Sequence, residues 1–132
     1  MHQIKVLGKP EPQGSSRAFI VNGKPIITSA NKNLKPWRAL VEWEARHQWG
    51  GKPPLEKAVA IVIEFYLHKP KSVKRPQPTV KPDLDKMVRS VLDGLTSAHV
   101  WNDDAQVITV VAHKMYADES HPEGAIIFVG ES

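Results

Sequence analysis

Two segments of the chain have the spacing of apolar residues that is typical of amphipathic helices. Between residues 31 and 49 the apolar positions recur close to every 3.6 residues, and Gly50-Gly51 follows as a stop signal. Over residues 84–95 the apolar positions lie 3, 1, 3, 1 and 3 residues apart, which is the strongest helical pattern in the chain. We therefore expect two helices, one in each half of the sequence.

The other apolar runs favour strands. Asn22-Gly23 stands between two of them, and this pair suits the positive φ angles of a type I′ hairpin turn. The run at 58–67 is almost unbroken and rich in β-branched residues, which predicts a strand in the middle of a sheet with both faces covered. The predicted strands are Ile4–Leu7, Ala18–Val21, Pro25–Thr28, Ala58–Leu67, Gln106–Tyr116 and Ala125–Val129.

Proline and glycine mark two long loops. Residues 8–17 are too rich in both for regular structure, and residues 69–82 hold four prolines and five cations. We expect the second segment to be a mobile surface loop. The element order is strand, hairpin, helix, strand, helix, strand, strand, with no linker or repeat. It predicts an α/β (α+β) fold in which residues 1–132 form one domain with a mixed sheet and two helices packed on it.

Composition narrows the class of protein. The 132 residues are 41% hydrophobic and 24% charged, as in globular chains, and hold no cysteine, which excludes disulfides and thiolate metal sites. No apolar run is long enough to span a membrane and the N-terminus lacks a signal peptide, so we expect a cytoplasmic protein without a membrane partner. The net charge of +4 favours a polyanionic partner.

Acidic residues are concentrated in one part of this basic chain. Five of the fourteen acids are Asp83, Asp85, Asp93, Asp103 and Asp104. If the second helix packs beside the following strand, the carboxylates at 83 and 85 can meet those at 103 and 104. Carboxylates about 4 Å apart repel by about 4 kcal/mol at an effective dielectric of 20, and a divalent cation removes that cost. Oxygen ligands alone select Mg²⁺, with Mn²⁺ as a possible substitute.

Each carboxylate also has a structural explanation. Asp83 can cap the second helix, Asp85 can oppose its dipole, and Asp85, Arg89 and Asp93 can form a ladder of salt bridges. Asp103 and Asp104 can simply form a turn. On this alternative the protein is a non-catalytic nucleic-acid-binding module that uses its basic loop. A nucleotide-sugar transferase, suggested by the bare Asp-x-Asp, needs a larger nucleotide-binding domain than this chain provides.

Motif order and spacing add a resemblance to a known family. The run Lys81-Pro82-Asp83-Leu84-Asp85 to Asp93-Gly94-Leu95, then Asn102-Asp103-Asp104-Ala105-Gln106, resembles the RusA-like Holliday-junction resolvases, which are small, phage-associated endodeoxyribonucleases. The early Gly8-Lys9-Pro10-Glu11-Pro12 loop is similar to theirs as well. The resemblance covers almost the whole chain. It implies a RusA-like fold, cleavage of branched DNA, a magnesium cofactor with no other small-molecule cofactor, and a homodimer.

Residue by residue, the resemblance implies that Asp83, Asp85 and Asp104 are the essential metal-binding carboxylates and that Asp103 assists them. Arg89 stands where the family usually has a catalytic Lys. A guanidinium contacts phosphate but does not release its proton, so we expect it to stabilise charge rather than act as a general acid. Lys86 replaces the usual Asn, and we interpret it either as a phosphate ligand or as a solvated surface residue.

The expected DNA contacts are cationic side chains that follow the phosphate backbone without reading bases. They are Lys69, Lys71, Lys74, Arg75 and Lys81 of the Pro-rich loop, with Lys86, Lys9 and Arg17. A four-way junction is two-fold symmetric, so two symmetric active sites in a C₂ homodimer are expected. We place the dimer surface on the N-terminal strand and hairpin, at Ile4, Val6, Ile20 and Ile26. Trp101 is expected to pack in the protein rather than stack on an unpaired base.

Overall fold

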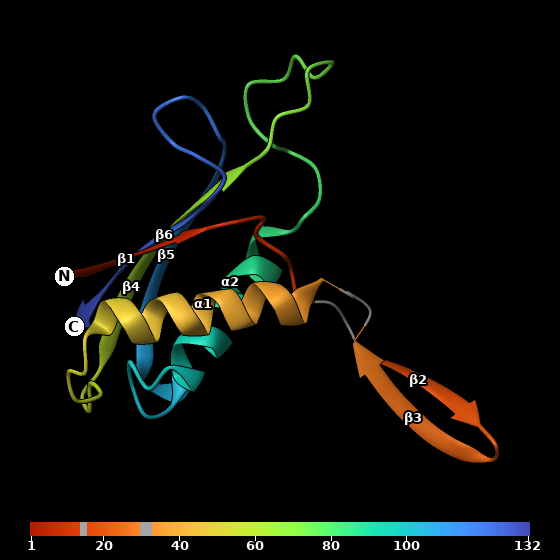
Figure 1. Cartoon of the computed structure of the whole chain (residues 1–132), viewed down its shortest axis with the longest axis horizontal. Coiled ribbons are helices and arrows are strands. Elements are labelled where there is room, and N and C mark those ends of the chain that lie inside the picture. The colour runs from red at the N-terminus through yellow and green to blue at the C-terminus, as the bar shows by residue number, and fades with distance from the viewer. Residues whose placement is uncertain (14–15, 30–32) are drawn as a thin grey trace.

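The computed structural model describes residues 1–13, 16–29 and 33–132, and its elements follow the predicted order (Figure 1). They are β1 (His2–Leu7), β2 (Ser16–Val21), β3 (Lys24–Ser29), α1 (Leu34–Trp49), β4 (Val59–Leu67), α2 (Leu84–Ser97), the 3₁₀ turn η1 (Asp104–Gln106), β5 (Val107–Tyr116) and β6 (Gly124–Glu131). Residues 31 and 32, where the first helix was predicted to start, lie outside the described residues. This helix ends at Gly50, in the left-handed conformation with φ 69°.

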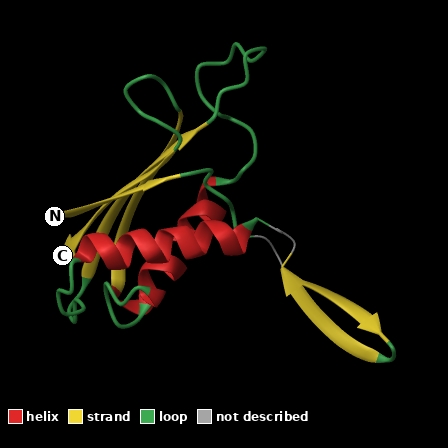
Figure 2. Ribbon diagram, in the orientation of Figure 1, coloured by secondary structure: helices red, strands yellow, loops and turns green. Residues whose placement is uncertain are grey.

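β4 lies in the middle of a four-stranded sheet of order β1-β6-β4-β5, as predicted. It runs antiparallel to β6 and parallel to β5, with α2 in the connection to β5. The prediction that both faces of β4 are covered is wrong. Figure 2 shows both helices on the same side of the sheet, and Val62 and Glu64, which point to the other side, are only half-buried. The open face still carries apolar residues, so periodicity could not tell the two faces apart.

The core lies between the helices and the covered face of the sheet. Ile61, Ile63 and Phe65 of β4 face α1 and α2 with no exposed surface. Burying each such side chain stabilises the fold by about 1.5–3 kcal/mol. Ile4 and Val6 of β1 are also completely buried, so the prediction that they form a dimer surface is wrong. Trp101 is buried too, and its indole Nε1 donates to Thr96 Oγ1 at 2.8 Å, which confirms a packing role.

A glycine allows the two helices to cross closely. A Cβ added at Gly94 would lie 2.7 Å from Val41 Cγ1 on α1, which is closer than side chains approach without one of them moving. Helix packing therefore explains the glycine in the Asp93-Gly94-Leu95 element. Since α1 also packs on β1, this crossing fixes where α2 and the carboxylates at its N-terminus stand relative to the sheet.

The hairpin of β2 and β3 extends away from the rest of the molecule (Figure 1). Its turn has φ angles of 51° at Asn22 and 76° at Gly23, which agrees with the predicted turn geometry. β2 begins at Ser16, so Arg17 lies on a strand and not in the loop to which the sequence analysis assigned it. The side chains of Ile20 and Ile26 on this hairpin lie outside the described residues. No helix in the described chain is long and apolar enough to cross a membrane.

Candidate functional site

The first pair of predicted carboxylates stands where α2 begins. Asp83 occupies the N-cap position with extended backbone angles, φ −70° and ψ 137°, but its side chain makes no cap hydrogen bond. Asp85 lies in the first turn, and both residues are exposed. The Asp83 carboxylate therefore does not cap the helix, and the capping explanation is wrong for this residue.

The predicted ladder of salt bridges along α2 is absent from the described part of the chain. Asp93 pairs instead with Arg38 of α1, at 3.6 Å between Oδ2 and Nη1. Arg89 is exposed and has no ion pair with any described residue. Lys86 Nζ lies 3.8 Å from Asp83 Oδ2, so its ammonium partly neutralises that carboxylate. Arg89 is thus left as a solvated cation on the same helix as the carboxylates.

The second acidic pair is Asp103 and Asp104, and only Asp103 caps a helix. Asp103 caps η1, accepting a hydrogen bond from Ala105 N at 2.9 Å, and the Gln106 amide oxygen accepts from Asp103 N at 2.9 Å to complete a capping box. The Gln106 amide nitrogen also donates to the carbonyl oxygens of Leu55 and Lys57. The turn-former explanation therefore holds for Asp103, and Gln106 ties the turn to the segment before β4.

Asp104 carries the clearest electrostatic signal among the predicted site residues. Partial desolvation, followed by a hydrogen bond that the protonated Asp104 carboxyl donates to the Asp103 carboxylate and by the charges of Asp103 and Asp93, raises the pKa of Asp104 above its ordinary value of 3.8. Its carboxylate is held at the start of β5, where η1 packs beside α2. A cation at this position would be stabilised by the same charges that now repel Asp104.

The described residues contain no group of three or more His, Cys, Asp or Glu side chains that could hold a metal ion together. The single shared cluster expected from the sequence is therefore not present. The charge of Asp93 acts on Asp104. Asp93 is eight residues from Asp85 on α2, which is about 12 Å along the helix axis. The donors are exposed carboxylates in two pairs, and Mg²⁺ usually takes one or two carboxylates with waters and substrate phosphate. The donor chemistry fits magnesium without an all-protein cage.

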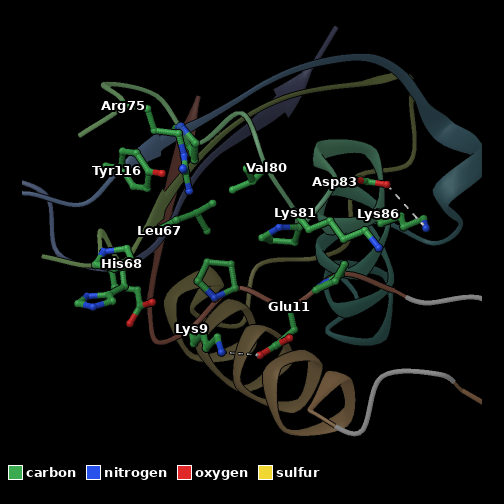
Figure 3. A pocket seen from close by; sticks show the side chains of 16 residues that line it. Lys9, Glu11, Leu67, His68, Arg75, Val80, Lys81, Asp83, Lys86 and Tyr116 are labelled. Atoms are coloured by element: carbon green, nitrogen blue, oxygen red, sulfur yellow. Dashed lines mark ion pairs between the residues drawn. The ribbon is translucent and has the colours of Figure 1, made fainter. Parts of the chain in front are cut away.

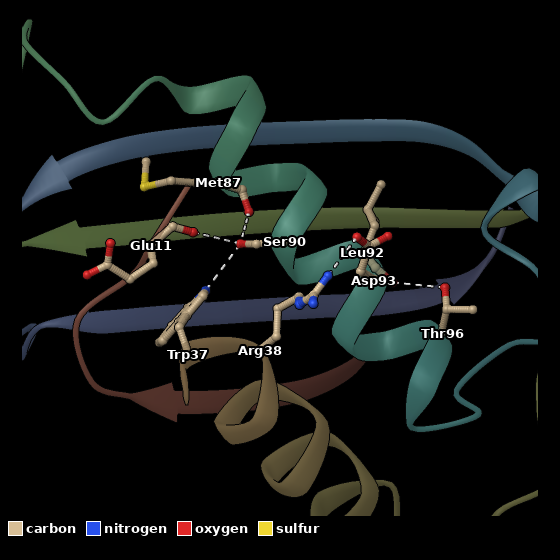
Figure 4. Close-up of polar contacts among 8 residues, drawn as sticks. All are labelled: Glu11, Trp37, Arg38, Met87, Ser90, Leu92, Asp93 and Thr96. Atoms are coloured by element: carbon tan, nitrogen blue, oxygen red, sulfur yellow. Dashed lines mark hydrogen bonds and ion pairs between the residues drawn. The ribbon is translucent and has the colours of Figure 1, made fainter. Parts of the chain in front are cut away.

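Buried hydrogen bonds hold the N-terminal loop against α2 (Figure 4). The Ser90 hydroxyl is completely buried, accepts from Trp37 Nε1 at 3.2 Å, and shares its proton between the carbonyl oxygens of Glu11, at 2.9 Å, and Met87, at 2.8 Å. Gln13 N donates to Lys86 O at 3.0 Å. The loop that resembles the family's early motif therefore lies beside the first turns of α2, next to Asp83.

Lys114 is a residue that the sequence analysis missed. From β5 its ammonium donates to Val80 O at 2.8 Å and to Pro82 O at 2.9 Å, so it holds the end of the Pro-rich loop directly before Asp83. Lys114 is 34 positions from Val80 and 32 positions from Pro82 in the sequence, so no local motif predicts the contact. The only sequence signal is a lysine on a face of a strand that is otherwise apolar.

Several predicted DNA contacts gather around one pocket (Figure 3). Lys9, Arg75, Lys81 and Lys86 line it together with Asp83. Lys69 lies over the ring of Tyr116, which also lines the pocket, with Nζ 5.6 Å from the ring centroid. Lys71 and Lys74 are exposed on the same loop outside the pocket lining. Arg17 lies near the start of β2, and its side chain lies outside the described residues.

Comparison with known proteins agrees with this arrangement. The family model described as endodeoxyribonuclease RusA matches residues 8–127, which include both acidic pairs and the Pro-rich loop. The chain is also 31% identical over 135 residues to the uncharacterized protein YqaN of Bacillus subtilis (strain 168), with 92% of each chain covered. The protein therefore belongs to the RusA endodeoxyribonuclease family. This membership indicates an endodeoxyribonuclease.

Proposed function

We propose that this protein is a divalent-metal-dependent endonuclease that resolves Holliday junctions and other branched DNA by paired nicking of phosphodiester bonds. The observation that carries the proposal is that Asp83, Asp85 and Asp104 are exposed, with Asp83 making no cap hydrogen bond, on a protein with a five-cation loop. Membership of the RusA family supports branched DNA as the substrate. On this proposal residues 1–132 work as one nuclease domain in the cytoplasm.

The carboxylates hold the cofactor and the neighbouring cations hold the phosphate. Magnesium would be held by Asp83 and Asp85 at one position and by Asp104, with Asp103 beside it, at the other, where it would lower the pKa of a water and neutralise charge on the scissile phosphate. Arg89, which has no ion pair with a described residue, contacts the phosphate oxygens with its planar guanidinium. Because that group keeps its proton, Arg89 stabilises charge and does not protonate the leaving oxygen.

Lys86 has two partners in turn. Before DNA arrives its ammonium pairs with Asp83 at 3.8 Å. If Asp83 held a divalent cation, the Lys86 ammonium would be free to contact the incoming phosphate. The family's usual Asn cannot do this, so Lys86 gives this chain an additional cation at the position of cleavage.

Two active sites are needed because a junction is resolved by two symmetric nicks, and a C₂ homodimer provides them. The buried Ile4 and Val6 cannot form its contact surface. β1 remains an edge strand of the sheet. The Gln48 amide bonds to the N–H and C=O of Lys5, and the remaining outward backbone groups of β1 can pair with the same strand of a second copy. The hairpin residues Ile20 and Ile26 remain candidates for the same interface.

The test is a nicking assay on a synthetic four-way junction. In Mg²⁺ the wild-type protein is expected to cut two opposed strands at symmetric positions, and EDTA is expected to abolish cutting. Asp83→Asn and Asp104→Asn are expected to reduce the rate at least about 100-fold while junction binding persists, because each removes a charge needed to hold the cation. Glu131→Gln, an exposed acid at the end of β6, removes the same charge and serves as the control.

The alternative of a non-catalytic binding module predicts a different result. In that case no preparation nicks any DNA, and Asp83→Asn leaves binding unchanged or tighter. Cutting of junction, flap and duplex at equal rates would overturn selectivity for branched DNA. Metal-dependent cutting that survives both Asp83→Asn and Asp104→Asn would overturn the assignment of these carboxylates.

A further inference from the structure

A pocket of about 600 Å³ lies between the N-terminal loop at residues 9–12 and the Pro-rich loop at residues 70–82. We call it the loop pocket. Its volume falls within the range of about 300–1,000 Å³ that is typical of sites for small ligands. One end is lined by Asp83 and Lys86 and the other by Leu67 and Tyr116 (Figure 3). A ligand in the loop pocket would therefore lie directly beside the proposed position of cleavage.

The far end of the loop pocket is apolar and aromatic. Leu67 is 8% exposed, Pro78 is buried, and the ring of Tyr116 is half-buried. The Tyr116 hydroxyl is enclosed and has no hydrogen-bond partner among the described residues. Prolines at 10, 12, 70, 78 and 82 complete much of the wall. Such a surface suits a flat ring that carries polar groups on its edge.

Four cations line the loop pocket, and two of them have no ion pair with a described acid. Lys9 pairs with Glu11 at 3.9 Å and Lys86 pairs with Asp83 at 3.8 Å. Arg75 and Lys81 also line the pocket and have no ion pair with any described residue. An anionic group attached to the ring would therefore find two cations without ion pairs in the pocket lining.

A flat ring with a phosphate attached is a nucleotide. We propose that the loop pocket takes one unstacked nucleotide of the branched DNA, next to the phosphate that the protein cuts. Its base packs against Tyr116 and Leu67, and its phosphate lies between Arg75 and Lys81. This inference rests on the proposed function, and it adds a base-binding step to loop contacts that would otherwise touch only the backbone.

Branched DNA is the substrate for which this step costs least. Inside a duplex each base is paired and stacked, and extruding it costs several stacking contacts. At a branch point stacking is interrupted, so a flanking base leaves the stack more easily. The loop pocket therefore contributes to selection of junctions over duplex, whereas the exposed cations of the Pro-rich loop bind both.

The test uses 2-aminopurine, a base analogue whose fluorescence rises when it leaves the stack. It is placed in turn at each position around the crossover of a synthetic junction, and protein is added to saturation in EDTA so that no bond is cut. A rise is expected at the position next to the cut and not in a duplex of the same sequence. Tyr116→Ala is expected to abolish the rise and weaken junction binding about tenfold.

Two matched controls isolate the pocket. Trp43→Ala removes an exposed aromatic ring on α1, 62% exposed, and is expected to leave the rise unchanged. Arg75→Glu and Lys74→Glu make the same charge change on adjacent residues, but only Arg75 lines the pocket. Both weaken binding, and at saturation only Arg75→Glu is expected to suppress the rise. This pair keeps the proposal falsifiable if Tyr116→Ala fails to fold.

The outcomes separate this inference from the proposed function. A junction that is bound and, in Mg²⁺, nicked without any rise in fluorescence overturns the inference and leaves the nuclease intact. A rise without metal-dependent nicking supports the pocket and overturns the nuclease. Equal suppression by Arg75→Glu and Lys74→Glu, or no junction binding at all, overturns the inference.

Discussion

Adjacent residues of one motif have separate roles. The Asp103 carboxylate caps η1, whereas the pKa of Asp104 is raised by desolvation and by its hydrogen bond and charge interactions with Asp103 and Asp93. The sequence could predict that both belong to an acidic turn, because Asp is common in caps and in metal sites alike. It could not predict which one the turn uses, since that depends on the Gln106 amide reaching across to Leu55 and Lys57.

The raised pKa of Asp104 leads to a prediction about stability. The folded state binds the Asp104 proton more tightly than the unfolded state, so ionisation destabilises the fold as pH rises past the ordinary value of 3.8. Without divalent metal, Asp104→Asn is expected to raise the melting temperature at pH 7 by up to a few degrees. The gain should shrink as the pH falls below about 4, where the wild-type carboxyl is protonated. Thermal melts in EDTA at both pH values measure it.

Asp118 provides a control of opposite sign. Slight desolvation acts to raise its pKa, but hydrogen bonds and charge from His121 hold the pKa of Asp118 below its ordinary value. Asp118→Asn is therefore expected to lower the melting temperature at pH 7. If both variants shift the melting temperature in the same direction, or if Asp104→Asn destabilises the metal-free protein, the electrostatic account of Asp104 fails.

Secondary-structure elements were the most predictable level of this molecule. Periodicity located both helices and the central strand because burial on one side imposes a regular spacing on the sequence. It correctly placed β4 in the middle of the sheet, but the prediction that both faces of β4 are covered was wrong. The prediction that Ile4 and Val6 form an interface was also wrong, because both lie in the core. Helix crossings depend on contacts between distant residues, so the reason for Gly94 appears only in the packing of α2 against Val41.

The Gly94 crossing predicts an unusual effect of alanine in a helix. Replacing glycine by alanine ordinarily stabilises a helix by about 1 kcal/mol. Here the added methyl would lie 2.7 Å from Val41 Cγ1, and overpacking costs about 1–3 kcal/mol. We expect Gly94→Ala to lower the free energy of unfolding by up to about 2 kcal/mol in urea titrations.

A double variant separates crowding from other effects. Val41→Ala alone removes buried methyl groups and is destabilising. Combined with Gly94→Ala, the new methyl occupies the space that Val41 leaves, so the loss in the double variant should be smaller than the sum of the two single losses. Strict additivity would show that the two side chains do not compete for space.

At the scale of the whole molecule, acids and bases are segregated along the chain. The acidic pairs stand at α2 and η1, while most of the expected DNA-binding cations lie on the Pro-rich loop, which Lys114 holds against the body through Val80 and Pro82. The sequence predicted both groups by composition. It could not predict that the described acids form two pairs instead of one cluster, because the spacing between segments is set by tertiary packing.

This segregation predicts how salt affects binding. Each loop cation that neutralises a phosphate contributes about 0.9 to the slope of log affinity against log salt. Lys71→Ala with Lys74→Ala, which removes two exposed loop cations, is expected to reduce the slope of junction binding by about 1.8 in anisotropy titrations. Lys5→Ala with Lys52→Ala removes the same charge away from the loop. Equal slopes for the two double variants would exclude the loop as the DNA-tracking element.

β5 spans the distance between the Asp104 turn and the loop end before Asp83. It begins directly after the Asp104 turn, and seven residues further on, about 23 Å at 3.3 Å per residue, Lys114 grips the carbonyl oxygens before Asp83. It is an edge strand whose one strand partner among the described residues is β4, and its register shifts at Val59/Ala60. A slip of two residues would leave every side chain on its own face yet move Lys114 about 7 Å from its partners. The alignment of one strand pair thus sets the separation between the two predicted parts of the site, the Asp104 turn and the loop end before Asp83.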